Sequence, residues 1–314
     1  MSDFSPYPPG DFDAFWVEAV EEAEAVSVDY KRSWRNDFEL PGFKVETLHF
    51  QSVGGRRVNG WIAVPDESLG SAESDIPSSA TRDPRSKRPG FLWIPPYGRE
   101  SLLPNEYGTR QGFVSLSLNF FGEEPFHQEK YKIERGYFAE GADDPHTWIF
   151  RRMFQDAYVA AKVLKAQHEV DEDRIGSMGM SQGAGMSIWL GAWCKYVKAV
   201  CADMPFLCAI RHTLLHAVHR YPLKELTDFM HSIPLGEERV LNTVAYFDTM
   251  NQATHCQIPT HVSLGLRDPA SRPDNVRACF RALPGNKELD ELDGGHDWHP
   301  SMVETNRRWM LANL

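Results

Sequence analysis

The chain has 314 residues, of which 42% are hydrophobic and 25% charged, a composition typical of globular proteins. Its formal net charge is −11, and nucleic-acid binding needs a clustered basic footprint, so we expect no nucleic-acid partner. The N-terminal segment has no basic and apolar signal pattern, and no apolar run approaches membrane-spanning length. We therefore expect a cytoplasmic protein with no membrane partner.

The cysteine and histidine patterns favour neither a disulfide framework nor a metal site. Five cysteines are an odd number, and no Cys-x-x-Cys pair occurs among them. His212, His216 and His219 have helical spacing, but there is no His-Glu-x-x-His motif and no carboxylate at ligand spacing. We expect buried thiols, a solvated histidine face, no metal and no cofactor. The cysteines are Cys194, Cys201, Cys208, Cys256 and Cys279.

The first 90 residues predict an N-terminal extension and a loop. Residues 11–26 have helical periodicity, and residues 44–50 and 57–64 predict two strands joined at Gly54-Gly55. We assign residues 1–65 to this helix and hairpin. Residues 66–90 are rich in Ser, Pro and charge and cannot offset their ordering entropy by burial, which predicts a polar loop insertion.

After residue 90, apolar strands alternate with amphipathic helices. This alternation predicts an α/β fold with a mostly parallel central sheet and helices on both faces, within a single domain of residues 1–314. We expect a turn at residues 170–174. The predicted strands are 91–94, 112–118, 175–180, 197–202, 260–265 and 288–292, and the predicted helices are 150–168, 182–194 and 272–283.

The segment Gly179-Met180-Ser181-Gln182-Gly183 matches the Gly-x-Ser-x-Gly pattern. The pattern alone is weak, but here it lies between an apolar strand and a helix of small residues, which is the setting a nucleophile elbow requires. Side chains at the two glycines would collide with the neighbouring strand and helix. The context indicates Ser181 as the nucleophile of an α/β-hydrolase fold.

A serine nucleophile needs a base to take its proton and an acid to orient that base. In this fold they follow the serine in the order acid, then histidine. His296, in a Gly-Gly turn after the last predicted strand, is our predicted base, with His299 as its rival. Asp268, which ends a strand, is our predicted acid.

Two alternatives to Asp268 remain open from the sequence. Asp203 also follows a predicted strand, and Asp248 is a weaker candidate.

The oxyanion hole of this fold uses two backbone amides, one from the residue after the nucleophile and one from the loop after an early strand. These are Gln182 and Tyr97, the latter in the segment Pro-Pro-Tyr-Gly. Phe206 and Leu207, in the loop after Asp203, are predicted to line a small substrate-binding pocket for the acyl group.

With these residues in hand, the chain resembles the acetyl xylan esterase/cephalosporin-C deacetylase family of carbohydrate esterases. The resemblance rests on the segments RGYFAEG, DEDRIGSMGMSQGAG, ADMPFLC, YFDTMN, SLGLRDPASRP and GGHDW, in this order. It implies the same nucleophile, acid and base, the amides of Tyr97 and Gln182 as oxyanion hole, a metal-free deacetylation of small carbohydrate esters, and a cytoplasmic hexamer.

The sequence departs from the family at three motifs. The family's Arg-Gly-Gln is replaced by Asn119-Phe120-Phe121-Gly122, its His-Gly-Tyr by Pro95-Pro96-Tyr97, and its terminal His-Glu by His296-Asp297. We therefore expect a serine esterase acting on short acyl esters. The alternatives are a peptidase, amidase or other ester hydrolase of the same fold, although such peptidases commonly carry a large additional domain. A non-catalytic binding protein that retains the fold is a further alternative.

Overall fold

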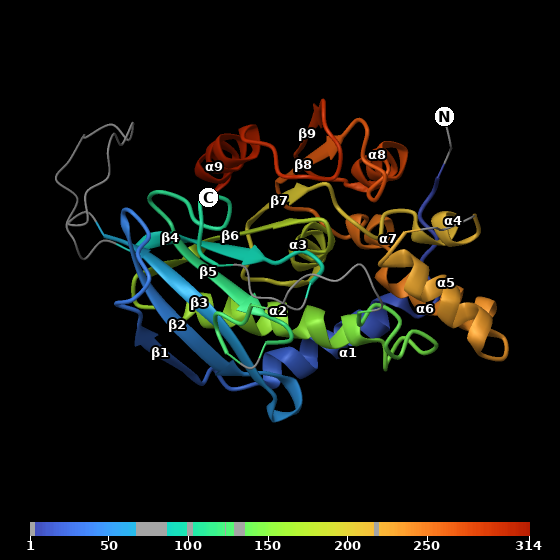
Figure 1. Ribbon diagram of the computed structural model, residues 1–314, viewed down its shortest axis with the longest axis horizontal. Helices are drawn as coiled ribbons and strands as arrows, with labels where there is room; N and C mark the ends of the chain where they lie inside the picture. Colours follow the sequence, from blue (N-terminus) through green and yellow to red (C-terminus); the bar gives the residue numbers. More distant parts are fainter. Residues whose placement is uncertain (1–3, 67–86, 99–102, 123, 129–135, 217–219) are drawn as a thin grey trace.

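The computed structural model describes residues 4–66, 87–98, 103–122, 124–128, 136–216 and 220–314. These residues form one nine-stranded sheet in the order β1-β2-β3-β5-β4-β6-β7-β8-β9, with helices on both faces (Figure 1). The insertion predicted at residues 66–90 lies mostly outside the described residues.

The strands are β1 (Tyr30–Trp34), β2 (Phe43–Gln51), β3 (Arg57–Pro65), β4 (Arg88–Ile94), β5 (Val114–Asn119), β6 (Val170–Met180), β7 (Ala199–Asp203), β8 (Thr260–Gly265) and β9 (Lys287–Leu292). The helices are α1 (Phe12–Ala25), α2 (Ile149–Lys165), α3 (Gln182–Trp193), α4 (Ile210–Leu214), α5 (Leu223–Ser232), α6 (Gly236–Phe247), α7 (Thr249–Ala253), α8 (Pro273–Ala282) and α9 (Ser301–Asn313), with a short 3-10 turn, η1 (Val53–Gly55).

The strands from β5 to β9 along the sheet pair in parallel, and β4, β5, β7 and β8 are buried along nearly their whole length because both faces of the sheet are covered there. Strand β4 shows the consequence. Leu92 and Ile94 belong to a core shared with α2 and α3, whereas Phe91 and Trp93 belong to a second core. The α/β class with a parallel central sheet is thus confirmed.

Different helices cover the two faces of the sheet. On one face Trp16 of α1 and Phe154 of α2 pack against Trp189 of α3, with ring centroids 5.2 and 4.9 Å from that of Trp189. On the other face Trp309 and Met310 of α9 join the second core. Figure 1 shows α1 and α2 on one side of the sheet and α9 on the other.

The N-terminal strands are antiparallel. Strand β2 pairs with β1 and β3, and β3 continues the sheet by pairing with β5. Between β2 and β3, Gly54 and Gly55 both have φ of +72°, which glycine adopts without steric strain. The division into an extension of residues 1–65 and a main part, within one domain, stays a prediction.

The prediction of a turn at residues 170–174 is wrong. Strand β6 begins at Val170, where Val170 and Asp171 pair with Arg88 and Pro89 of β4 before a register shift. Pairing with a distant strand overrode the local turn signal of the acidic residues. The structure also adds β1, α4 to α7 and α9, for which the sequence analysis predicted no element.

The cysteines are buried, as expected from the sequence. All five are free thiols. Among the described residues, no helix is both long enough and apolar enough to cross a membrane.

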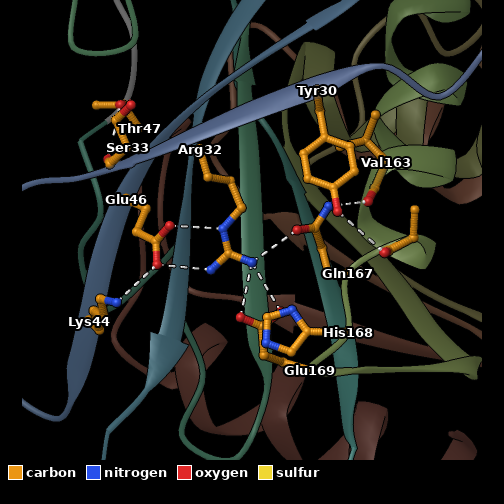
Figure 2. A network of polar contacts seen from close by, with 11 residues as sticks. Tyr30, Arg32, Ser33, Lys44, Glu46, Thr47, Val163, Gln167, His168 and Glu169 are labelled. Atoms are coloured by element: carbon orange, nitrogen blue, oxygen red, sulfur yellow. Dashed lines mark hydrogen bonds and ion pairs between the residues drawn. The ribbon is translucent and has the colours of Figure 1, made fainter.

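Arg32 joins the edge strand β1 to the connection between α2 and β6 (Figure 2). Its guanidinium donates to both carboxylate oxygens of Glu46 at 2.9 and 3.0 Å and, at 3.0 Å, to Gln167 and to Glu169. Burial opposes the charged form, but the carboxylates of Glu46 and Glu169 outweigh it, and the pKa of Arg32 is raised. Only 13% of the Arg32 side chain is exposed, so solvent screens these contacts weakly.

We expect Arg32→Met to lower the free energy of unfolding by about 2 kcal/mol, because it leaves Glu46 and Glu169 without the mostly buried cation that binds them. Urea denaturation followed by tryptophan fluorescence measures the change. The matched control is Arg307→Met on α9, since Arg307 pairs at 3.4 Å with Glu304, whose side chain is 68% exposed. That control should change stability by less than about 0.5 kcal/mol. Equal effects of the two substitutions would contradict the prediction.

Candidate active site

Ser181 occupies a strained turn between β6 and α3, with φ of 57° and ψ of −117°. Two glycines make this turn possible. A Cβ at Gly179 would lie 2.2 Å from the carbonyl carbon of Gly183, and one at Gly183 would lie 2.1 Å from the carbonyl oxygen of Ile94. Residues with side chains at either position would therefore displace the helix or the neighbouring strand.

The structure brings together the three side chains that the sequence selected. His296 follows β9, and Asp268 follows β8. The His296 Nε2 lies 2.9 Å from the Ser181 Oγ, and the His296 Nδ1 lies 2.6 Å from the Asp268 Oδ2. Parallel strands place these segments at one edge of the sheet, because their carboxyl ends all lie there.

The Asp268 carboxylate is held in a single orientation. Its Oδ1 accepts hydrogen bonds from the backbone N–H groups of Ala270 and Ser271, at 2.7 and 2.8 Å. Its Oδ2 is left to accept from the Nδ1–H of His296. This tautomer leaves Nε2 as an acceptor that faces the Ser181 hydroxyl, as proton abstraction requires.

The exposed fraction of the side chains increases from Asp268 through Ser181 to His296. The Asp268 side chain is fully buried, and Ser181 is 8% exposed. The His296 side chain is 23% exposed. Solvent therefore reaches His296, while the Asp268 carboxylate is buried beneath it.

The side chains considered as alternative base and acids, His299, Asp203 and Asp248, form hydrogen bonds with other residues. The His299 Nδ1 lies 2.7 Å from the Ser301 hydroxyl at the start of α9. The buried Asp203 accepts from Ser263 and Asn306, at 2.7 and 2.8 Å, and burial raises its pKa.

Asp248 has a structural position. It caps α7 by accepting from the Met250 amide, and it also accepts from the amides of Ala209 and Ile210. Burial raises the pKa of Asp248 to about 6, against the opposing effect of these hydrogen bonds.

The two predicted oxyanion residues lie on facing elements. Gln182 is the first residue of α3, so its backbone N–H has no partner within the helix and lies at the positive end of the helix dipole. Tyr97 follows β4, in a loop that begins against Gly183, since a Cβ on that glycine would lie 2.8 Å from the Pro95 carbonyl oxygen. The absence of a side chain at Gly183 thus allows this loop to approach the start of α3.

Two further residues contact this region and were missed by the sequence analysis. Tyr137 donates its hydroxyl to the Gln182 side chain at 2.9 Å, and Glu225 accepts from the Tyr97 hydroxyl at 2.8 Å. Tyr137 lies in the segment RGYFAEG, whose family resemblance was a usable signal. Glu225 lies on α5 in a segment with no recognisable motif.

Phe121 stands within the segment that replaces the family's Arg-Gly-Gln. Its ring stacks on that of Tyr137, with centroids 4.2 Å apart and an interplanar angle of 25°. The guanidinium of Arg152 lies 6.0 Å from the centre of the Phe121 ring. An aromatic contact therefore supports Tyr137 at this position.

Phe206 and Leu207 line a pocket, and that this pocket binds the acyl group stays a prediction. Its wall combines Phe206 and Leu207, from the loop after β7, with Ala270 and Ser271, whose amides hold Asp268. The amide of Phe206 also donates to the Ser181 carbonyl oxygen at 3.0 Å, so this loop is anchored to the elbow. The pocket thus lies beside Asp268.

In the part of the chain that the structure describes, no three His, Cys, Asp or Glu side chains lie together as metal ligands would. The rings of His212 and His216 lie 4.3 Å apart, and His219 is outside the described residues.

Comparison with solved structures gives close matches along the whole chain. An acetyl xylan esterase from Paenibacillus sp. R4 is 23% identical with a TM-score of 0.83, covering 99% of this chain and 98% of that one. Acetyl xylan esterase 1 from Thermoanaerobacterium sp. JW/SL YS485 is 24% identical with a TM-score of 0.79, covering 98% and 95%. These likenesses establish the α/β-hydrolase fold.

Sequence comparisons point the same way. The acetyl esterase Axe7A of Xylanibacter ruminicola is 22% identical, and the match covers 96% of this chain but 66% of that protein. The chain therefore spans slightly less than two thirds of that relative. The model of the acetyl xylan esterase (AXE1) family matches residues 4–77 and 107–311, most of the sequence. The chain belongs to the acetyl xylan esterase family.

Proposed function

We propose that this protein is a carboxylic-ester hydrolase, a serine esterase that removes acetyl and other short acyl groups from small carbohydrate or related esters. The observation that carries the proposal is the continuous hydrogen-bonded series from Ser181 through His296 to Asp268. Membership of the acetyl xylan esterase family supports the acetyl group as the acyl group.

The proposed reaction has two steps. His296 Nε2 takes the proton of the Ser181 hydroxyl while the oxygen attacks the ester carbonyl carbon, and the carbonyl electrons move to the oxygen. The backbone amides of Tyr97 and Gln182 stabilise this oxyanion. Collapse of the intermediate breaks the bond to the alcohol, which leaves with the proton from His296.

In deacylation, water is the nucleophile and the Ser181 oxygen is the leaving group. Water enters beside the exposed edge of His296, loses a proton to Nε2 and attacks the acyl-enzyme. The second tetrahedral intermediate expels the Ser181 oxygen, which recovers the proton, and the carboxylic acid is released. Asp268 stabilises the imidazolium in both steps, and every bond change is completed without a cofactor.

Two expectations from the family resemblance stay part of this proposal. They are a cytoplasmic location and a homo-oligomer with hexameric assembly. The cephalosporin-C deacetylase activity that the resemblance also implies belongs to the same class of reaction, removal of an acetyl group from an ester.

We expect Ser181→Ala to lower kcat for p-nitrophenyl acetate by about 10⁵–10⁶-fold, because it removes the attacking oxygen. Fluorophosphonate labelling should be lost in parallel. The control is Ser187→Ala on the same helix, since Ser187 is fully buried and hydrogen-bonded to Ser177. Near wild-type hydrolysis by Ser181→Ala would refute the proposed function.

Asp268→Asn should lower kcat by about 10⁴-fold while leaving the fold intact. An asparagine Oδ1 can still accept from the amides of Ala270 and Ser271, but its NH₂ group then faces His296 Nδ1. The imidazole is forced into the tautomer whose Nε2–H points at Ser181 and cannot accept a proton. The comparison is Asp203→Asn, which should lower kcat less than tenfold; a larger loss there than at Asp268 would move the acid to Asp203.

We expect kcat/KM to fall on the order of 100-fold from p-nitrophenyl acetate to the octanoate, because Phe206 and Leu207 leave little room for a longer chain. Phe206→Ala should raise the octanoate value on the order of tenfold relative to acetate. Initial rates on acetate, butyrate and octanoate esters beside acetylated sugars provide the measurement. Preference of the wild type for octanoate would exclude the short-acyl assignment.

A further inference from the structure

Glu225 is a buried carboxylate on α5 that the proposed mechanism does not use. It is 3% exposed, and three donors of the described residues surround it. Its Oε1 accepts from the Tyr97 hydroxyl at 2.8 Å and from the Gly136 amide at 2.7 Å, and its Oε2 accepts from the Phe138 amide at 3.0 Å. Since a buried carboxylate needs such compensation, these contacts fix three backbone segments to one another.

The glycine at position 136 permits this arrangement. A Cβ there would lie 1.9 Å from the Tyr97 phenol oxygen and 3.4 Å from the Glu225 Oε1. Any other residue would push the Tyr97 hydroxyl away from the carboxylate. The close approach therefore depends on Gly136 and on the phenol together.

Tyr137 lies between the two amides that Glu225 holds and reaches the other side of the oxyanion hole. Its phenol oxygen accepts from the Gly98 amide at 3.4 Å and lies 2.9 Å from the Gln182 Oε1. An amide N–H can only donate, so the phenol oxygen accepts from Gly98 while its hydrogen is donated to the Gln182 Oε1. The Tyr97 and Tyr137 rings also pack at 4.8 Å.

These contacts connect both halves of the oxyanion hole. One donor belongs to Tyr97, in the loop after β4, and the other to Gln182, at the start of α3. We propose that Glu225 is a positioning residue that, through Tyr97 and Tyr137, holds these two backbone amides at the separation the oxyanion requires. This inference rests on the proposed function, because it concerns the same reaction.

The expected effect follows from how oxyanion holes act. Their donors stabilise the transition state more than the bound ester, and a displacement of about 1 Å can cost about 100-fold in rate. We call the contacts of Glu225 with Tyr97 and of Tyr137 with Gln182 the clamp. Loss of the clamp should therefore lower kcat and leave KM nearly unchanged. A residue that only stabilises the fold would lower the melting temperature without this separation of kcat from KM.

The test uses three conservative variants that keep both backbone amides: Glu225→Gln, Tyr97→Phe and Tyr137→Phe. Glutamine at position 225 retains one acceptor oxygen, but its NH₂ group replaces the other oxygen and faces a donor. The matched control is Tyr158→Phe, since the buried Tyr158 also donates to a carboxylate, that of Glu24, at 2.9 Å. Each protein is assayed at full length with p-nitrophenyl acetate, and its melting temperature is recorded.

We expect the three clamp variants to lose about 10- to 100-fold in kcat with KM within about threefold, and the control to keep kcat within about twofold. Affinity for phenylboronic acid, whose tetrahedral adduct with Ser181 presents an oxygen to the same amides, should fall in parallel. The double variant Tyr97→Phe/Glu225→Gln should lose less than the product of the two single losses, because both act through one contact.

Clamp variants that keep kcat and boronate affinity within about twofold would overturn the inference, whatever their melting temperatures. An equal kcat loss in Tyr158→Phe would overturn it as well. Either result leaves the proposed function intact as long as Ser181→Ala is inactive. An active Ser181→Ala would instead remove the reaction itself.

Discussion

The close approach of α3 to its neighbours is the constraint on which the site depends. Gly179 and Gly183 allow the helix to begin directly against β6 and against the loop after β4. The same approach sets the strained backbone of Ser181 and brings that loop to the first turn of α3. The nucleophile, the helix N-terminus and the loop of Tyr97 are therefore placed by a single steric condition, the lack of two Cβ atoms.

Four of the buried carboxylates in the described residues have different structural roles, which follow from their hydrogen-bond partners. Asp268 receives two backbone amides on one oxygen and keeps the other for His296. Asp203 binds Ser263 and Asn306 and thereby ties β7 to β8 and α9. Asp248 caps α7, while Glu225 accepts from two other segments, at Tyr97 and at residues 136–138. A carboxylate that faces an imidazole acts on its protonation, whereas one that faces amides fixes the backbone.

Much of the fold could be predicted because its strands and helices are strongly patterned. The strands at residues 260–265 and 288–292 and the helix after Ser181 appear within a residue or two of their predicted ends. The failures share a cause. Residues 170–174 look like a turn locally, yet pairing with Arg88 and Pro89 makes them part of β6. Helices α4 and α7 have five residues each, too few for a helical periodicity to show in the sequence, whereas α5 and α6 were missed by the sequence analysis.

The sequence by itself selected Ser181, His296 and Asp268 as the proposed nucleophile, base and acid, because a Gly-flanked serine after a strand and the order of the segments along the chain can be read without the structure. It left Asp203 and Asp248 open, since all three aspartates follow or flank apolar segments. Only the tertiary structure decided which carboxylate faces His296, and only it revealed Glu225 beside Tyr97, 128 positions away in the chain. Contacts of that range depend on how the sheet brings distant loops to one edge, and such contacts leave no pattern in either segment.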